Sequence, residues 1–287
     1  MLWVNTIVQG VLLGGLYALF AAGLSLIFGV MGLVNVAHGD LIVLVAYMAY
    51  FAGELMGLGP FMSLVVVLPM AAGLGYVLQR AVLNRTLGAD LPPLLVTFGL
   101  SVIIQNGLLT LFTADGRKMQ AGAFEIASWK VSDDLSVGLL PLTQFLCAVA
   151  VIAGLQMLFY RTALGRAFRA TSDDRTVAQL MGVETKHIFA VAMALSLAVA
   201  AIAGIFMGIR KSFDPYSGPL MLIFGFEAII IGGLGSLWGT LAGGVVLGVA
   251  QTVGAQINVG WPIIAGHIAF VLVLLLRPQG LFPKVFR

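Results

Sequence analysis

The chain has 287 residues, of which 60% are hydrophobic and only 9% are charged. Soluble domains carry about 25% charged residues, so a water-soluble fold could not cover its surface with these charges. The mean hydropathy of +1.06 and the 36 glycines are typical of helices that pack closely in lipid. The net charge of +3 is modest, and in a membrane protein it reflects loop asymmetry rather than nucleic-acid binding.

Cysteine and histidine usage narrows the chemistry further. The single cysteine, Cys147, excludes an internal disulfide framework. No cluster of cysteine and histidine has metal-ligand spacing in the sequence, so we expect no metal site.

Apolar runs long enough to cross a bilayer occupy most of the chain, since a spanning helix needs about 20 apolar residues. The expected membrane segments are residues 4–37, 41–53, 61–79, 94–113, 139–160, 188–209, 220–256 and 260–276. The 220–256 run is too long for one pass, and we expect it to cross twice and turn at residues 232–239. The prediction is an all-α, polytopic bundle of about eight or nine transmembrane helices, some of them broken, in one membrane domain over residues 1–287.

Lysine and arginine set the expected orientation, because cytoplasmic loops are enriched in them. If the 161–187 loop faces the cytoplasm, ten basic residues lie inside and five outside. The inside set is Arg80, Arg85, Arg161, Arg166, Arg169, Arg175, Lys186, Arg277, Lys284 and Arg287; the outside set is Arg117, Lys118, Lys130, Arg210 and Lys211. We therefore expect the 114–137 loop outside and the C-terminus in the cytoplasm.

Small residues recur four apart along several of these segments. Gly10 and Gly14 form one such pair, and Gly244 and Gly248 form another. Small residues at this spacing lie on one helix face and let backbones approach. We expect them to pack helices within this chain rather than to mark a dimer face.

The first interruption is the run Gly32-Leu-Val-Asn-Val-Ala-His-Gly-Asp40. It places Asn35, His38, Gly39 and Asp40 between apolar halves. Transporters often break helices near the membrane midplane, where polar groups line a cavity. A short cytoplasmic turn between two ordinary helices explains the same pattern equally well.

The second interruption follows Glu227 and is the run Gly232-Gly-Leu-Gly-Ser-Leu-Trp-Gly239. A carboxylate facing lipid costs several kcal/mol, so Glu227 should face protein or water. A position near the outer interface, with the side chain among the headgroups, is an equally good explanation. The pairing of two interruptions suggests an inverted repeat around a pathway. The pathway candidates of this run are Glu227, Gly232, Gly233 and Gly235.

A polar stripe lies between these interruptions in the sequence. Thr97, Ser101 and Gln105 are spaced four apart, so they share one helix face. Amides in hydrocarbon need partners, so this face must meet other helices or a wet path. Interhelical hydrogen bonding is the favoured explanation for any one of them.

The 161–186 loop carries a candidate docking element. Ser172 or Asp173 is expected to cap a helix that runs to Met181, with Gly182 as its stop. Val177, Leu180 and Met181 would form an apolar edge, which a merely basic loop does not need. The candidate docking residues are Gly165, Arg166, Arg169, Asp173, Asp174, Arg175, Val177, Ala178, Leu180, Met181 and Gly182.

ATP cannot be bound by a phosphate loop here, because no Gly-Lys pair exists in the chain. If ATP drives transport, another chain must bind it. Two alternatives from other classes remain. One is an ion-coupled secondary transporter or channel that uses Glu227 or Asp40. The other is an intramembrane enzyme that uses His38 and Asp40, although no nucleophile or metal set accompanies them.

Four motifs resemble branched-chain amino-acid ABC transporter permeases of the LivH type. They are 32–40; 165–170 with Ala178 and Gly182; 232–239; and the closing Arg277-Pro-Gln-Gly-Leu-Phe282. They follow the family's order and span nearly the whole chain. The resemblance implies a permease of the ABC importer type that is not itself an enzyme. It would form half of the pathway for branched-chain amino acids or a related small polar or carboxylate solute.

The same resemblance implies a set of partners. A second permease of the LivM type would complete the pore, and a periplasmic protein would deliver the solute. Two cytoplasmic ATPases would hold ATP and Mg, so this chain itself binds no cofactor. Residues 165–182 match the segment that contacts an ATPase. The chain would be a multi-pass protein of the bacterial inner membrane.

Overall fold

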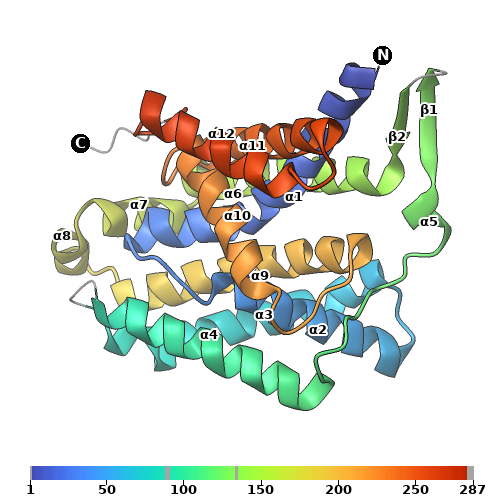
Figure 1. Ribbon diagram of the computed structural model, residues 1–287. Helices are drawn as coiled ribbons and strands as arrows, with labels where there is room; N and C mark the ends of the chain where they lie inside the picture. Colours follow the sequence, from blue (N-terminus) through green and yellow to red (C-terminus); the bar gives the residue numbers. More distant parts are fainter. Residues whose placement is uncertain (1, 88–90, 133–134, 283–287) are drawn as a thin grey trace.

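The computed structural model describes residues 2–87, 91–132 and 135–282 (Figure 1). Within them, seven helices are long and apolar enough to cross a membrane, and two shorter apolar helices accompany them. The long helices are α1 (Leu2–Met31), α2 (His38–Met56), α3 (Pro60–Ala81), α4 (Leu91–Phe112), α6 (Leu139–Arg161), α9 (Thr185–Arg210) and α11 (Leu237–Ile257); the short ones are α10 (Gly218–Gly232) and α12 (Pro262–Leu276). Together they confirm the expected polytopic helical bundle, and the 220–256 run does turn after residue 232.

The smaller elements lie in the connections. They are η1 (Leu83–Arg85), α5 (Ala123–Ile126), β1 (Ser128–Ser132), β2 (Leu135–Gly138), α7 (Ala163–Asp173) and α8 (Arg175–Leu180). The strands form an antiparallel hairpin that pairs Trp129 with Val137, in a region expected only as an external loop. The sequences of both strands alternate polar and apolar residues, Ser-Trp-Lys-Val-Ser in β1 and Leu-Ser-Val-Gly in β2, so the period-two signal was present in the sequence and was missed.

Helix α1 is the centre of the bundle and is buried over most of its length. It packs against α11 on one side and against α9 on another. A Cβ atom at Gly14 would lie 2.5 Å from the Cα of Val245, and one at Gly248 would lie 2.3 Å from the carbonyl oxygen of Gly10. The two glycine pairs therefore face each other, which confirms that they pack helices within the chain.

The two ends of α1 mark the two ends of the molecule. Gln9 donates a hydrogen bond to the carbonyl of Ser136 beside β2, at 2.9 Å. Ser172 of α7 donates one to the carbonyl of Gly29, at 2.7 Å. Residues 9 and 29 are about 30 Å apart along a helix axis. The hairpin and the α7–α8 segment therefore lie at opposite ends of the bundle (Figure 1), as the distribution of lysine and arginine predicts. Lys284 and Arg287 lie outside the described residues.

The orientation of these ends can be tested by thiol labelling. Ser128→Cys and Thr176→Cys place single thiols at two exposed positions, in a Cys147→Ala background. An impermeant maleimide added to intact cells should label the first and spare the second, because only the hairpin end faces outside. Permeabilised cells should label both. Labelling of position 176 alone in intact cells would show that the orientation is inverted.

Candidate functional site

The interruption at residues 32–37 lies inside the protein. Asn35, His38 and Asp40 are 3%, 1% and 2% exposed. His38 Nε2 lies 3.0 Å from the carbonyl oxygen of Phe20, which belongs to the middle part of α1. Helix α2 therefore begins within the bundle. A cytoplasmic turn would have left these side chains in water, so the broken-helix alternative fits the structure.

Asp40 is the point where three helices meet. Gln105 of α4 donates to Asp40 Oδ1 at 2.9 Å and also lies 3.2 Å from Ser101 Oγ. A Cβ atom at Gly218 of α10 would lie 2.1 Å from the same Oδ1, and one at Gly39 would lie 2.0 Å from the Gly218 carbonyl oxygen. Only glycines fit at these two positions. The polar stripe on α4 is thus explained by interhelical hydrogen bonding.

Glu227 lies in a second buried polar cluster. It is 4% exposed, and its Oε1 is hydrogen-bonded to Nδ1 of His267 on α12. No hydrogen-bond partner reaches its Oε2 among the described residues. Nearby, the hydroxyl of Tyr17 donates to Gln251 of α11. A headgroup position for Glu227 is therefore wrong, since burial places it within the protein.

His267 is the residue that sequence reasoning missed. Its side chain is 44% exposed, whereas the Glu227 side chain is only 6% exposed. The signal was available, because His267 interrupts the apolar 260–276 segment just as Glu227 interrupts 220–256. Two polar side chains that each need a partner in hydrocarbon are natural partners for one another.

The glycine run forms a tight turn between α10 and α11. Gly233 and Gly235 have positive φ angles of 106° and 77°, which side chains rarely adopt. A Cβ atom at Gly232 would lie 2.0 Å from the carbonyl oxygen of Gly239. Phe282, in the closing motif, donates its amide to the Gly232 carbonyl at 2.9 Å. These glycines therefore shape the turn and its contact with the C-terminal motif.

Both interruptions reach one cavity beside the docking segment. This cavity has a volume of about 480 Å³ and is lined by Gly32, Ser172, Arg175 and Gly235, among others. The sequence separates the interruptions by almost 200 residues, and the fold brings their edges to the same end of the bundle. Gly235 is thus the member of the glycine run that faces open space.

The docking segment consists of two helices, where the sequence analysis expected one. Helix α7 continues to Asp173, and the N-cap of α8 is Asp174 instead of Ser172 or Asp173. Asp174 Oδ1 accepts from the amides of Thr176 and Val177 at 2.7 and 3.0 Å. The expected stop is confirmed, since Gly182 has a φ of +85°.

The predicted apolar edge is exposed. Val177, Leu180 and Met181 are 54%, 81% and 79% exposed, whereas Ala178 on the other side is buried. Arg166 and Asp173 are also exposed. Three large apolar side chains are therefore exposed on a segment that is otherwise polar.

Three of the candidate docking residues instead hold the segment onto the membrane domain. A Cβ atom at Gly165 would lie 2.2 Å from the Leu158 carbonyl oxygen. Arg169 donates to the carbonyl of Phe159, and the Arg175 guanidinium lies 4.7 Å from the ring centroid of Phe189. Gly165 and the two arginine side chains contact the membrane helices, so they position the apolar edge rather than form it.

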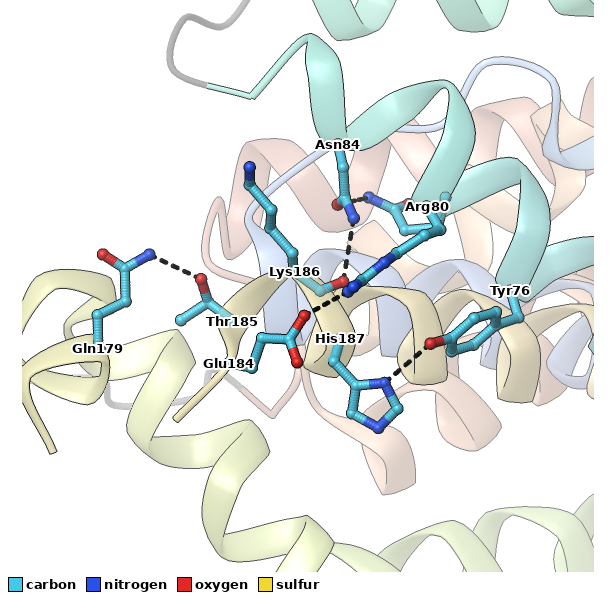
Figure 2. A network of polar contacts seen from close by, with 9 residues as sticks. Tyr76, Arg80, Asn84, Gln179, Glu184, Thr185, Lys186 and His187 are labelled. Carbon is cyan, nitrogen blue, oxygen red and sulfur yellow. Dashed lines mark hydrogen bonds and ion pairs between the residues drawn. The ribbon is translucent and has the colours of Figure 1, made fainter. Parts of the chain in front are cut away.

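A polar network joins this segment to its neighbours (Figure 2). It connects the end of α3 and η1 with the start of α9, and the motifs of the sequence analysis do not include it. Arg80 forms an ion pair with Glu184 and holds the pKa of that carboxyl below its usual range. Tyr76 is hydrogen-bonded to His187 at 3.0 Å.

The membrane helices and their buried polar breaks define a multi-pass membrane transport protein. The chain belongs to the family described as branched-chain amino acid transport system / permease component, whose profile matches residues 6–276. It is 29% identical to BraD of Pseudomonas aeruginosa, a high-affinity branched-chain amino acid transport system permease protein, over 98% of this chain and 96% of BraD. It is 28% identical to LivH of Salmonella typhimurium, over 96% of this chain and 94% of LivH.

Two further comparisons extend this result, one with a permease sequence and one with a solved structure. The LivM permease protein of Escherichia coli is 27% identical over 93% of this chain and 68% of LivM. The structure of PsaBC from Streptococcus pneumoniae in complex with Fab has a similar fold, with a TM-score of 0.51 at 14% identity over 94% of this chain and 91% of that one.

The contact between Gly218 and Asp40 gives a stability prediction. Gly218→Ala should destabilise the protein by about 1–3 kcal/mol, because the new methyl group meets the backbone as well as the side chain of Asp40. Thermal unfolding in detergent measures this. Gly99→Ala is the matched control, since nothing lies within 4 Å of a Cβ there; it should be neutral or stabilising. Equal melting temperatures for the two variants would contradict the contact.

Proposed function

We propose that this chain is one of two permease subunits of an ATP-driven importer and forms half of its translocation pathway. The observation that carries the proposal is the α7–α8 segment. It presents an exposed apolar edge at one end of the bundle, in a sequence without a phosphate loop. The substrates would be branched-chain amino acids or a related small polar or carboxylate solute. The names of BraD and LivH support this class.

The partners follow from the same proposal. Two cytoplasmic ATPases, which hold ATP and Mg, would dock at α8, and a periplasmic protein would deliver the solute to the opposite end. A LivM-type permease would complete the pore in the bacterial inner membrane. The match of this chain to both LivH and LivM supports two permeases of one fold. ATP hydrolysis would thus occur on other chains, and this subunit would bind no cofactor.

The face formed by α10 and α12 would line the translocation pathway and contact the second permease. Helix α12 buries only Gly266 among its residues, and His267 is half-exposed on this otherwise apolar helix. An imidazole bonded to a carboxylate is unfavourable in lipid, so another chain or a wet pathway should cover it. Glu227 and His267 would then contact the solute, and Asn35, His38 and Asp40 would hold the helix break behind them.

Glu227 and His267 can be tested by substitution. Glu227→Gln keeps the shape of the side chain and removes the charge that the imidazole contacts. We expect leucine uptake by the reconstituted complex to fall about tenfold, the effect of losing a hydrogen bond to a charged group. Asn106→Leu is the control, because Asn106 is exposed on α4 and its side chain, among the described residues, bonds to the backbone of its own helix. Normal uptake with Glu227→Gln would remove this pair from the pathway.

The docking edge is tested with Leu180→Asp. Apolar side chains that seat in a groove supply most of the affinity of a docked helix, so a charge here should prevent coupling. We expect loss of leucine uptake and of ATP hydrolysis stimulated by the loaded binding protein. Leu180→Met retains an apolar side chain and should retain both activities. Wild-type stimulation with Leu180→Asp would show that the segment does not dock an ATPase. Uptake driven by an ion gradient without any ATPase would favour an ion-coupled transporter.

A further inference from the structure

Helix α8 is connected to helix α3 through the first turn of α9 (Figure 2). Gln179, at the end of α8, donates to Thr185 Oγ1 at 2.8 Å. The residue before Thr185 is Glu184, which forms the ion pair with Arg80 of α3. The segment with the exposed apolar edge is therefore fixed to α3 and α9 by side-chain contacts, and not only by the chain that connects it to α9.

A second connection runs through two side-chain amides. Asn84 of η1 donates to the carbonyl of Lys186 in α9 at 3.0 Å, and Gln79 of α3 donates to Asn84 Oδ1 at 3.0 Å. Figure 2 shows the side-chain amide of Asn84 directed at the backbone of α9 at Lys186. The 3₁₀ turn positions Asn84, because it bends the chain back toward α9 directly after α3 ends.

The two connections differ in burial, and this decides which one fixes the geometry. The side chains of Arg80 and Glu184 are 46% and 63% exposed, and exposed ion pairs contribute little to stability. Gln79 and Asn84 are only 0% and 9% exposed. A buried amide that loses its partner is strongly disfavoured. The amide pair therefore restricts the position of α3 relative to α9 more than the ion pair does.

Gln79 also reaches the helix break. It lines a small cavity of about 10 Å³ together with Asn35 and Thr97. Thr97 accepts a hydrogen bond from the amide of Val36 at 3.3 Å, and Asn35 Oδ1 accepts one from the amide of Ala37 at 3.0 Å. Gln79 therefore lies in the same packed region as the 32–37 segment.

We infer that Gln79 and Asn84 are positioning residues that make α3, η1 and the start of α9 move as one unit with α8. A displacement of α8 by an ATPase would then reach the helix break at Asn35 rather than being lost in the loop. Close packing supports this transmission, since α3 and α9 are packed along their lengths and packed interiors transmit strain. The inference rests on the proposed docking of an ATPase at α8.

Two variants separate a positioning role from a stabilising one. Asn84→Leu leaves the Gln79 amide buried without its partner, so both stability and coupling should fall. Gln79→Leu with Asn84→Leu replaces both amides by apolar groups of similar shape, which restores most of the stability. It does not restore the hydrogen bond to Lys186. Arg80→Ala is the matched control, because it removes only the exposed ion pair.

The measurement is ATP hydrolysis by the reconstituted complex with and without binding protein loaded with leucine, together with the melting temperature. We expect the stimulation to fall about threefold to tenfold in both the single and the double variant, the usual range for coupling between sites. Arg80→Ala should stay within about twofold of the unmodified complex. The double variant should melt close to the unmodified protein while remaining poorly stimulated.

Different results overturn different statements. Normal stimulation in the double variant would show that the amides only stabilise the fold, which overturns the inference and leaves the proposed function intact. A loss with Arg80→Ala as large as that of the double variant would assign the role to the ion pair and overturn the inference too. Absence of stimulation in the unmodified complex, with leucine and then with related small carboxylate solutes on the binding protein, would overturn the proposed function and this inference together.

Discussion

The structure depends on one constraint of the bilayer: a polar group in hydrocarbon must find its partner within the protein. Asp40 meets Gln105 and joins α2 to α4. Glu227 meets His267 and joins α10 to α12, while Tyr17 meets Gln251 and joins α1 to α11. Each pair holds two helices at one relative height, because sliding either helix would leave both groups unpaired. The few interior polar residues therefore fix how the bundle is assembled.

Glycine allows the helices to pack closely, which matters because lipid supplies no hydrophobic force that drives helices together. Dispersion contacts need backbones to approach closely, and at Gly14 and Gly39 even a methyl group would overlap a neighbouring helix. The glycines of α1 and α11 were predictable, because their spacing of four shows in each helix alone. The contact of Gly39 with Gly218 was not, since it joins residues that are far apart in the sequence and belong to no repeat.

The sequence predicted whatever depends on composition along one segment: the membrane helices, the exposed apolar edge of α8 and, through four motifs, the family. It could not predict features decided by contacts between segments. Ser172, Asp173 and Asp174 are all good N-caps, so propensity cannot choose among them. The position of the N-cap follows from Ser172. This residue lies within α7, and its hydroxyl donates to the carbonyl of Gly29 in α1. That contact extends α7 and leaves Asp174 to cap α8. The side-chain amide of Asn84 in η1 was equally unpredictable, because its partner, the carbonyl of Lys186, lies 102 residues later in the sequence.

A docking element must be exposed and yet rigid, and the α7–α8 segment has both properties although α8 is short. A helix of six residues is unstable on its own in water. Here the Asp174 cap satisfies its first amides, buried Ala178 anchors its inner face, and Arg175 lies against Phe189. Leu180 is thus presented with little conformational freedom left to lose, which favours binding. A rigid edge can also be pushed, whereas a flexible loop would absorb the displacement.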